Sequence, residues 1–217
     1  MPAINTVLFD LDGTLIDTAP DMAHALNLLL KEENKPLIEF KNIRPMVSNG
    51  SAALVQLGFP EIENAQTIAR LKQRYLEIYQ RSLCQHSVLF PGMAELIDYI
   101  EQKKMNWGVV TNKPGWLTEP LMKQLKLTPR AACIISGDST ANRKPHPEPM
   151  HLACRLANTL AEHCIYVGDA QRDIQAGINA GMKTVVAGYG YIDDDENIAD
   201  WGADHTINAP CELRQFI

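Results

Sequence analysis

The sequence lacks the marks of an exported or membrane-bound chain. It holds only five cysteines in 217 residues, none of them in a CxxC pair, and no run approaches the roughly 18 apolar residues of a membrane span. An odd, scattered set of cysteines predicts neither a disulfide framework nor a zinc site. The first ten residues also lack the basic segment and apolar run of a signal peptide. These absences favour a cytoplasmic protein that does not bind a membrane.

Strongly basic stretches are also missing, and the net charge is −6. A nucleic-acid surface usually needs a basic patch, so a nucleic-acid partner is not expected. Apolar residues make up 46% and charged residues 21% of the chain, which is ordinary for a folded globular protein. We therefore expect a small molecule as the partner, and a monomer or a homodimer.

Short apolar runs rich in β-branched residues predict the strands of a sheet. Runs of about five apolar residues without alternation are typical of strands buried on both faces of a parallel sheet. Helical patterns follow most of these runs, which is the order of an α/β fold. The expected strands are 4–9, 107–111, 131–136, 163–167 and 183–187, with a weaker sixth at 204–207. The expected helices of this part are 92–104, 116–125, 148–158 and 171–180.

The alternation of strands and helices stops between the first and second strands. No convincing strand occurs from 19 to about 88. Helical patterns in this segment cover 20–33, 50–57 and 62–83. The sequence therefore predicts a Rossmann-like parallel sheet core, residues 1–16 and 90–217, with an inserted helical segment at 17–89. The Pro-Gly pair within 87–92 marks the return to the core.

Polar side chains suited to chemistry follow the predicted strands at their carboxyl ends. Ligands of open parallel sheets bind at that edge, so these side chains are expected to meet there. Each alone has an ordinary explanation, such as capping of the next helix, but several in order at strand ends do not. They are Asp10, Asp12, Gly13, Thr111, Asn112, Lys144, Asp169 and Asp173.

Four stretches in this order resemble the motifs of the haloacid dehalogenase superfamily. They are DLDGTL at 10–15, the strand-ending Thr111, Lys144 before a proline, and GDAQRD at 168–173. The match spans nearly the whole chain, and the chain looks most like the phosphoglycolate phosphatase group. Less diagnostic stretches, GVVTNKP, KPHPEP, AGYGYI and WGAD, also resemble a bacterial subgroup that acts on N-acetylmuramic acid 6-phosphate. The helical insertion at 17–89 looks like the inserted α-helical cap domain of that superfamily.

The resemblance implies hydrolysis of a small phosphorylated metabolite with Mg²⁺ as the cofactor. A bare carboxylate cluster would repel a phosphate dianion, and a cation held by oxygen ligands removes that repulsion. Asp10 and Asp169 are the expected side-chain ligands, and the resemblance adds the backbone carbonyl of Asp12 and a supporting, water-mediated role for Asp173. Asp10 would attack phosphorus to give an aspartyl-phosphate, while Asp12 would act as general acid and then as general base.

Other core residues are expected to stabilise the transferring phosphoryl group. Lys144 would supply a fixed cation, and Thr111 and the backbone N–H of Asn112 would donate hydrogen bonds. Gly13 would let the chain turn tightly after the nucleophile, so that N–H groups there also face the phosphate. A carboxyl crowded by other carboxylates, as we expect for Asp12, can hold a proton near neutral pH.

The cap is expected to close over the site and select the substrate. Its candidate contacts are Asp17, Thr18, Arg44, Ser48, Asn49, Gly50 and Ser51. Arg44 could pair with a carboxylate or phosphate, or could be an exposed arginine at a helix end. The turn 48–51 could meet substrate or cap the next helix, with capping slightly favoured. In the core, Ala170 stands where many relatives carry a hydroxyl residue, which should alter the surroundings of the metal without abolishing its binding.

The sequence alone leaves other functions open. A phosphomutase would use the same aspartyl-phosphate and return the phosphoryl group to a sugar. A signalling receiver also gathers aspartates, a threonine and a lysine on a parallel α/β sheet, but the long helical insertion argues against one. A dehalogenase would need neither a metal nor Asp12. Phosphoglycolate and N-acetylmuramic acid 6-phosphate both carry a carboxylate, so Arg44 does not distinguish them.

Overall fold

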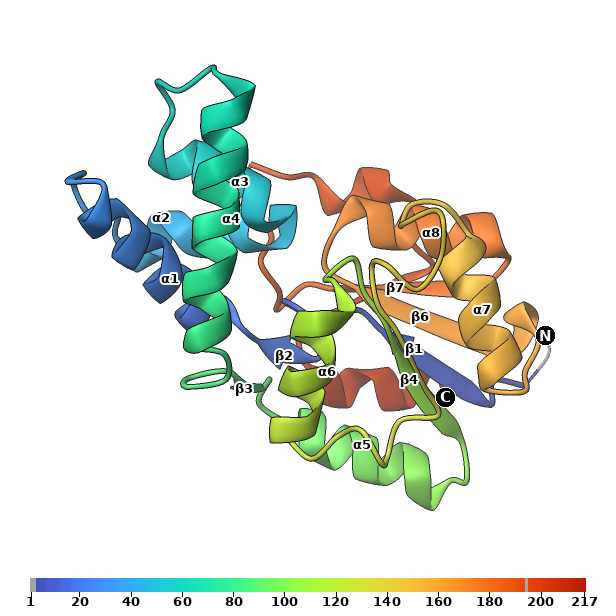
Figure 1. Ribbon diagram of the computed structural model, residues 1–217. Helices are drawn as coiled ribbons and strands as arrows, with labels where there is room; N and C mark the ends of the chain where they lie inside the picture. Colours follow the sequence, from blue (N-terminus) through green and yellow to red (C-terminus); the bar gives the residue numbers. More distant parts are fainter. Residues whose placement is uncertain (1–2, 194) are drawn as a thin grey trace.

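A six-stranded parallel sheet forms the centre of the computed structural model, which describes residues 3–193 and 195–217 (Figure 1). The strand order is β5-β4-β1-β6-β7-β8. The strands are β1 Thr6–Phe9, β4 Asn106–Val110, β5 Cys133–Ile135, β6 Cys164–Gly168, β7 Lys183–Ala187 and β8 His205–Ile207. All six strands expected from the apolar runs are confirmed, and β1 lies in the interior of the sheet because β4 and β6 pair with its two edges.

Helices cover both faces of this sheet, with α7 and α8 on one face and α5 and α6 on the other (Figure 1). They are α5 Met93–Gln102, α6 Gly115–Gln124, α7 Glu148–Leu156 and α8 Gln171–Ala180. Side chains of β1 alternate between the two layers, as strand geometry requires. Leu8 packs in the cluster that contains Met150, while Val7 and Phe9 pack in the cluster that contains Leu96. Short 3₁₀ helices complete the core at Ala161–His163, Ile198–Trp201 and Pro210–Gln215.

The inserted segment is helical, as the sequence predicts, and lies at the carboxyl ends of the strands (Figure 1). Its helices are α1 Ala19–Glu32, α2 Phe40–Ile43, a 3₁₀ helix at Arg44–Asn49, α3 Gly50–Gly58 and α4 Ala65–Arg81. α4 packs against both α1 and α3. Helix α2 and the 3₁₀ helix are not predicted by the sequence, because each is too short to show a helical period. Among the described residues, no helix combines the length and apolar character needed to cross a membrane.

Two short strands connect the helical insertion to the sheet core. β2 Ile16–Asp17 pairs antiparallel with β3 Val88–Leu89. The expectation of no strand up to residue 88 is therefore wrong at its end, because a two-residue strand carries no readable period. The pair places the entry and the exit of the insertion side by side, which suits a hinge between the helices and the sheet.

Candidate active site

The carboxyl ends of three neighbouring strands bring the predicted core residues together. Asp10 follows β1, Thr111 follows β4, and Asp169 follows β6 at the start of the turn into α8. Asp173 lies in the first turn of α8, and Lys144 reaches the same place from the loop after β5. All five are buried, with at most 4% of each residue exposed.

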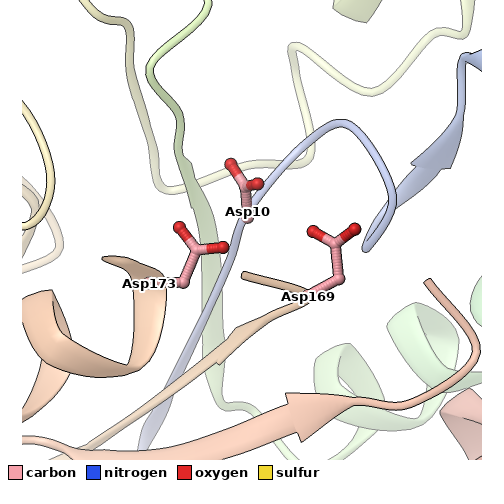
Figure 2. Close-up of side chains that lie close together, drawn as sticks. All are labelled: Asp10, Asp169 and Asp173. Atoms are coloured by element: carbon pink, nitrogen blue, oxygen red, sulfur yellow. The ribbon is translucent and has the colours of Figure 1, made fainter. Parts of the chain in front are cut away.

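Three of these residues form a compact group of carboxylates (Figure 2). Asp10, Asp169 and Asp173 each offer one oxygen, and these oxygens all lie within 4.8 Å of one another. Burial, opposed by the charge of Lys144 and assisted by that of Asp173, raises the pKa of Asp10 to about 6. Burial and the charges of Asp10 and Asp173 raise the pKa of Asp169 to about 7. Asp10 and Asp169 therefore resist ionisation unless positive charge is brought to them.

Lys144 supplies part of that charge. Its Nζ donates to Oδ1 of Asp10 at 2.7 Å, to the carbonyl of Val110 at 3.0 Å and to the hydroxyl of Tyr166 at 2.8 Å. Burial acts most strongly on this ammonium and favours its neutral form, but the charges of Asp10 and Asp173 prevail and raise the pKa of Lys144. The lysine is therefore a fixed cation at the nucleophile candidate.

Asp173 keeps one oxygen without a hydrogen bond. Its Oδ1 lies 2.7 Å from Nζ of Lys144, but the three N–H groups of that lysine already point to other acceptors. In residues 3–193 and 195–217, no other donor reaches this buried oxygen. Its second oxygen, Oδ2, accepts from the backbone N–H of Ala170 at 3.1 Å. A buried carboxylate oxygen that accepts no hydrogen bond is costly, and a metal cation, in addition to the nearby Lys144 ammonium, would satisfy it.

The oxygen ligands that this group offers fit a hard divalent cation such as Mg²⁺. Such ions take carboxylate and carbonyl oxygens, and three carboxylates against one lysine leave negative charge to balance. Asp173 contributes one carboxylate oxygen to the ligand atoms that lie within 4.8 Å of one another, and its Oδ1 accepts no hydrogen bond from the described residues. The family resemblance implies a water-mediated role for Asp173, and the geometry also allows it to be a direct ligand.

Asp12 has a different environment from the other aspartates. Its Oδ1 accepts from Nζ of Lys113 at 2.9 Å and from the hydroxyl of Thr18 at 2.6 Å. The expectation that neighbouring carboxylates crowd Asp12 is wrong, because its described partners are a cation and a hydroxyl. Asp12 still lines the cavity described below, together with Asp10.

Gly13 serves the packing of the site. Its φ is +86°, and a Cβ at this position would lie 2.0 Å from Oδ2 of Asp169. Its backbone N–H donates to the carbonyl of Ile16 at 3.1 Å. The tight turn is therefore as expected, but the Gly13 amide is already used inside the loop and does not face a phosphate site. The glycine instead allows the loop to approach Asp169.

Thr111 and Asn112 lie where the sequence predicts, beside the cavity. Thr111 Oγ1 accepts from the backbone N–H of Lys113 at 3.1 Å, which leaves the hydroxyl hydrogen free to donate. The side chain of Asn112 exchanges two hydrogen bonds of 3.1 Å with the backbone of Lys144. These bonds fix the loop after β4 against the loop that carries the lysine.

A cavity of about 430 Å³ lies between these core residues and the helical insertion. As the sequence predicts, Ser48, Asn49, Gly50 and Ser51 line it from the insertion. Other lining residues are not singled out by the sequence analysis. They include Lys72, Tyr75 and Tyr79 of α4 and the core residues Lys113, Arg143 and Arg172. Tyr75 and Tyr79 are one helical turn apart, so their spacing predicts a shared face but not what that face meets.

Arg44 is not among the residues that line this cavity. Its guanidinium donates to the carbonyl of Gly190 at 2.9 Å and lies 4.8 Å from the ring centre of Tyr191. Neither use considered for Arg44 describes this contact, which joins the insertion to the loop after β7. Arg172, inside the GDAQRD motif, does line the cavity, as Arg143 does, and it also donates to the carbonyl of Ser48.

The turn at residues 48–51 does not cap the helix that follows it. No side chain makes a capping hydrogen bond at the start of α3. The Ser48 hydroxyl donates instead to Oδ2 of Asp169 at 2.6 Å. The capping prediction is therefore wrong, because the Ser48 side chain is directed to the core carboxylate and not to the backbone N–H groups at the start of α3.

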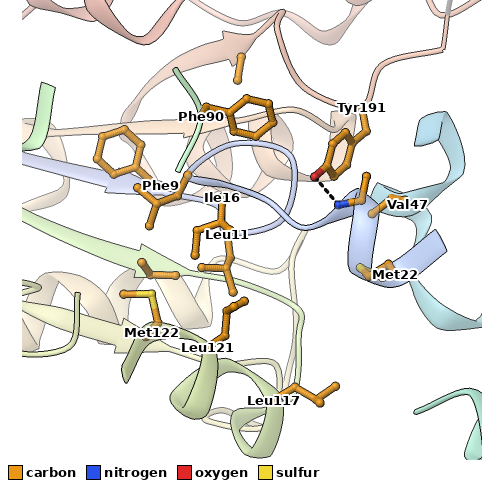
Figure 3. Packing of buried hydrophobic residues seen from close by; sticks show 14 of the residues in the cluster. Phe9, Leu11, Ile16, Met22, Val47, Phe90, Leu117, Leu121, Met122 and Tyr191 are labelled. Atoms are coloured by element: carbon orange, nitrogen blue, oxygen red, sulfur yellow. Dashed lines mark hydrogen bonds between the residues drawn. The ribbon is translucent and has the colours of Figure 1, made fainter. Parts of the chain in front are cut away.

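Tyr191 ties the entry of the insertion to the core. Its hydroxyl accepts from the backbone N–H groups of Thr18 at 2.7 Å and Ala19 at 2.9 Å, and donates to Asp17 at 2.7 Å. Figure 3 shows its ring between Phe90 and the segment of the insertion around Val47. The candidates Asp17 and Thr18 therefore make structural contacts at the hinge.

The fold and the site together define an enzyme with a carboxylate-based active site at the edge of an α/β sheet. More particularly, the chain belongs to the haloacid dehalogenase-like hydrolase family, whose model matches residues 7–187. The resemblance read from the four motifs is confirmed. Membership of a hydrolase family also argues against the signalling receiver.

Two relatives and a solved structure match nearly the full chain. The N-acetylmuramic acid 6-phosphate phosphatase of Pseudomonas putida is 44% identical over 214 residues, which cover 99% of this chain and 96% of that protein. The phosphoglycolate phosphatase of Xanthomonas campestris is 41% identical over 207 residues, covering 95% and 93%. The crystal structure of a predicted phosphoglycolate phosphatase from Haemophilus somnus has a TM-score of 0.87 at 26% identity, covering 100% and 99%.

Proposed function

We propose that this chain is a Mg²⁺-dependent phosphatase that hydrolyses a small phosphorylated metabolite through an aspartyl-phosphate at Asp10. The buried group formed by Asp10, Asp169 and Asp173 beside Lys144 carries the proposal, because it is a site for a cation and an anion together. Bound there, Mg²⁺ would neutralise carboxylate charge and help to hold the phosphate. The phosphatase names of the two relatives support the same activity.

The positions of the residues support a role for each of them. An oxygen of Asp10 attacks phosphorus while the bond to the leaving oxygen breaks, and Asp12 gives that oxygen a proton. Asp12 then takes a proton from the water that releases inorganic phosphate and restores Asp10. Lys144, the hydroxyl of Thr111 and the backbone N–H of Asn112 stabilise the charge on the phosphoryl oxygens.

The size and charge of the cavity favour a phosphorylated sugar acid over phosphoglycolate. A cavity of about 430 Å³ is within the range of sites for ligands of sugar size, and a two-carbon acid would leave much of it to water. Lys72, Arg143 and Arg172 add positive charge to its lining beyond the nucleophile. A substrate whose carboxylate lies at a distance from its phosphate could pair with these positively charged side chains. N-acetylmuramic acid 6-phosphate is therefore the substrate we favour, with phosphoglycolate as the alternative.

A direct assay tests this function. The purified protein is incubated with Mg²⁺ and either N-acetylmuramic acid 6-phosphate, phosphoglycolate or other sugar phosphates, and released phosphate and sugar products are measured. We expect phosphate release, with the highest kcat/KM for the phosphorylated sugar acid and none after addition of EDTA. The Asp10→Asn variant, purified in parallel, measures contaminating phosphatase. An isomerised sugar phosphate without phosphate release would show a phosphomutase instead.

Several further expectations belong with this proposal. Residues 17–89 act as the cap, Ala170 leaves metal binding intact, and the protein is a cytoplasmic monomer or homodimer. Size-exclusion chromatography with light scattering would measure the oligomeric state, and magnesium titration of Ala170→Ser would show what the missing hydroxyl changes.

A further inference from the structure

We infer that Lys113 is a positioning residue that holds the carboxylate of Asp12 ready for proton transfer, and that Tyr79 connects this contact to the helical insertion. The inference rests on the proposed function, because it concerns the acid that protonates the leaving group. Lys113 lies beside Asn112, after β4, and carries none of the roles assigned from the four motifs.

Lys113 is a buried cation with two partners. Only 5% of its side chain is exposed, and its Nζ donates to Oδ1 of Asp12 and to the hydroxyl of Tyr79, each at 2.9 Å. The ammonium also lies 4.6 Å from the ring centre of Tyr79. A buried ammonium that lost its carboxylate would be left uncompensated, so the contact with Asp12 is expected to persist.

The two oxygens of Asp12 are not equivalent. Lys113 and the hydroxyl of Thr18 both bind Oδ1. Over the part of the chain that the structure describes, no hydrogen bond reaches Oδ2, while Asp12 lines the cavity. Two donors on one oxygen fix the rotation of the carboxylate and leave the other oxygen for the leaving group. Lys113 thus acts on the reaction through Asp12 and not by touching the phosphate.

Tyr79 extends this arrangement to the insertion. It lies in α4 with 1% of the residue exposed, whereas Lys113 and Asp12 lie in loops after β4 and β1. Three elements that are distant in sequence therefore meet at one ammonium. Movement of α4 away from the sheet would remove a partner of Lys113, so the position of the insertion and the orientation of Asp12 are coupled.

The dependence of rate on the leaving group distinguishes this role from a structural one. An alkyl phosphate needs a proton on its leaving oxygen, whereas p-nitrophenyl phosphate releases a stable anion and needs little acid catalysis. We expect Lys113→Met to lower kcat/KM about 100-fold for a sugar phosphate and by less than about 10-fold for p-nitrophenyl phosphate. Lys113→Arg, which keeps the charge, should recover part of the loss on the sugar phosphate.

Two more variants complete the test. Tyr79→Phe keeps the Lys113–Asp12 pair and should cause a smaller loss of the same kind, which also serves if Lys113→Met does not fold. Lys183→Met breaks a lysine–aspartate pair of 2.7 Å with Asp204 near the opposite edge of the sheet, and should leave both rates unchanged. Equal losses on both esters, or no loss on the sugar phosphate, would overturn the inference. A wild-type protein inactive on every phosphoester would instead refute the proposed function.

Discussion

Ser48 of the helical insertion donates a hydrogen bond of 2.6 Å to Oδ2 of Asp169, a carboxylate of the sheet core. The same carboxylate accepts from the backbone N–H of Tyr191 at 2.9 Å and is 1% exposed. The insertion therefore touches an expected metal ligand directly. The backbone carbonyl of Ser48 also accepts a hydrogen bond from Arg172, so Ser48 binds the core through its hydroxyl and its carbonyl.

Removal of this hydroxyl should weaken the metal-free protein most. Ser48→Ala is expected to lower the free energy of unfolding in EDTA by about 1.5–3 kcal/mol, the usual contribution of a hydrogen bond to a charged group. In excess Mg²⁺ the loss should be smaller, because the cation would stabilise the carboxylate without help from Ser48. Urea denaturation with and without Mg²⁺ measures both values. Ser51→Ala, which removes a neighbouring hydroxyl that lines the cavity, is the matched control; a loss that is equal in both conditions would contradict the explanation.

The carboxylate group makes stability depend on pH in the absence of metal. The pKa values of Asp10 and Asp169, raised by burial to about 6 and about 7, exceed the value of about 3.9 for an unfolded aspartate. Between about pH 4 and pH 7 the folded protein therefore binds more protons than the unfolded chain. Its free energy of unfolding should fall as the pH rises through this window and level off above it.

Magnesium should reverse this trend, because it binds the ionised carboxylates. We expect the rise in melting temperature caused by Mg²⁺ to be larger at about pH 7.5 than at about pH 5, as measured by thermal denaturation. Asp169→Asn removes one of the titrating groups and should flatten the pH dependence of the metal-free protein. A magnesium effect of the same size at both pH values would argue that the cation binds elsewhere.

Replacement of Asp12 should separate the two chemical steps. Asp12→Asn keeps the shape of the side chain but can neither give nor take the proton, so kcat should fall by about 10²–10⁴-fold. With an activated ester such as p-nitrophenyl phosphate, the first step can still proceed and the phosphoenzyme should accumulate. Acid quenching followed by intact-mass measurement detects the added phosphoryl group. Asp10→Asn should show neither turnover nor phosphoenzyme, and turnover near the wild-type rate in either variant would refute its assigned role.

Residues at the strand ends were predictable from the sequence because their placement follows from the strands themselves. Asp10 and Asp169 directly follow apolar runs, and adjacent parallel strands bring such positions to one edge of the sheet. The six strands were predictable for a similar reason, since burial on both faces leaves continuous apolar runs. The short pair of β2 and β3 was not predictable, because its pairing depends on how the insertion returns to the core.

The contacts between the insertion and the core were not predictable, because they depend on tertiary packing. Arg44 and Arg172 both have the chemistry to bind an anion, and sequence spacing gives no reason to prefer one. Only the packing shows that Arg44 meets Gly190 and Tyr191, whereas Arg172 reaches the cavity. In the same way, Asp12 pairs with Lys113 from the loop after β4, a contact that the sequence does not indicate.

The two arginines should accordingly affect different properties. Arg172→Gln removes a cavity cation and should raise KM for a phosphorylated sugar acid by about 10-fold or more, since a charge-assisted hydrogen bond contributes about 1.5–3 kcal/mol. Arg44→Gln removes a contact between the insertion and the loop after β7, and should lower the free energy of unfolding by about 1 kcal/mol with little change in KM. Steady-state kinetics and urea denaturation of both variants measure the four values. An increase in KM for Arg44→Gln as large as that for Arg172→Gln would show that Arg44 binds substrate after a rearrangement of the insertion, and would restore the role that the sequence had allowed for it.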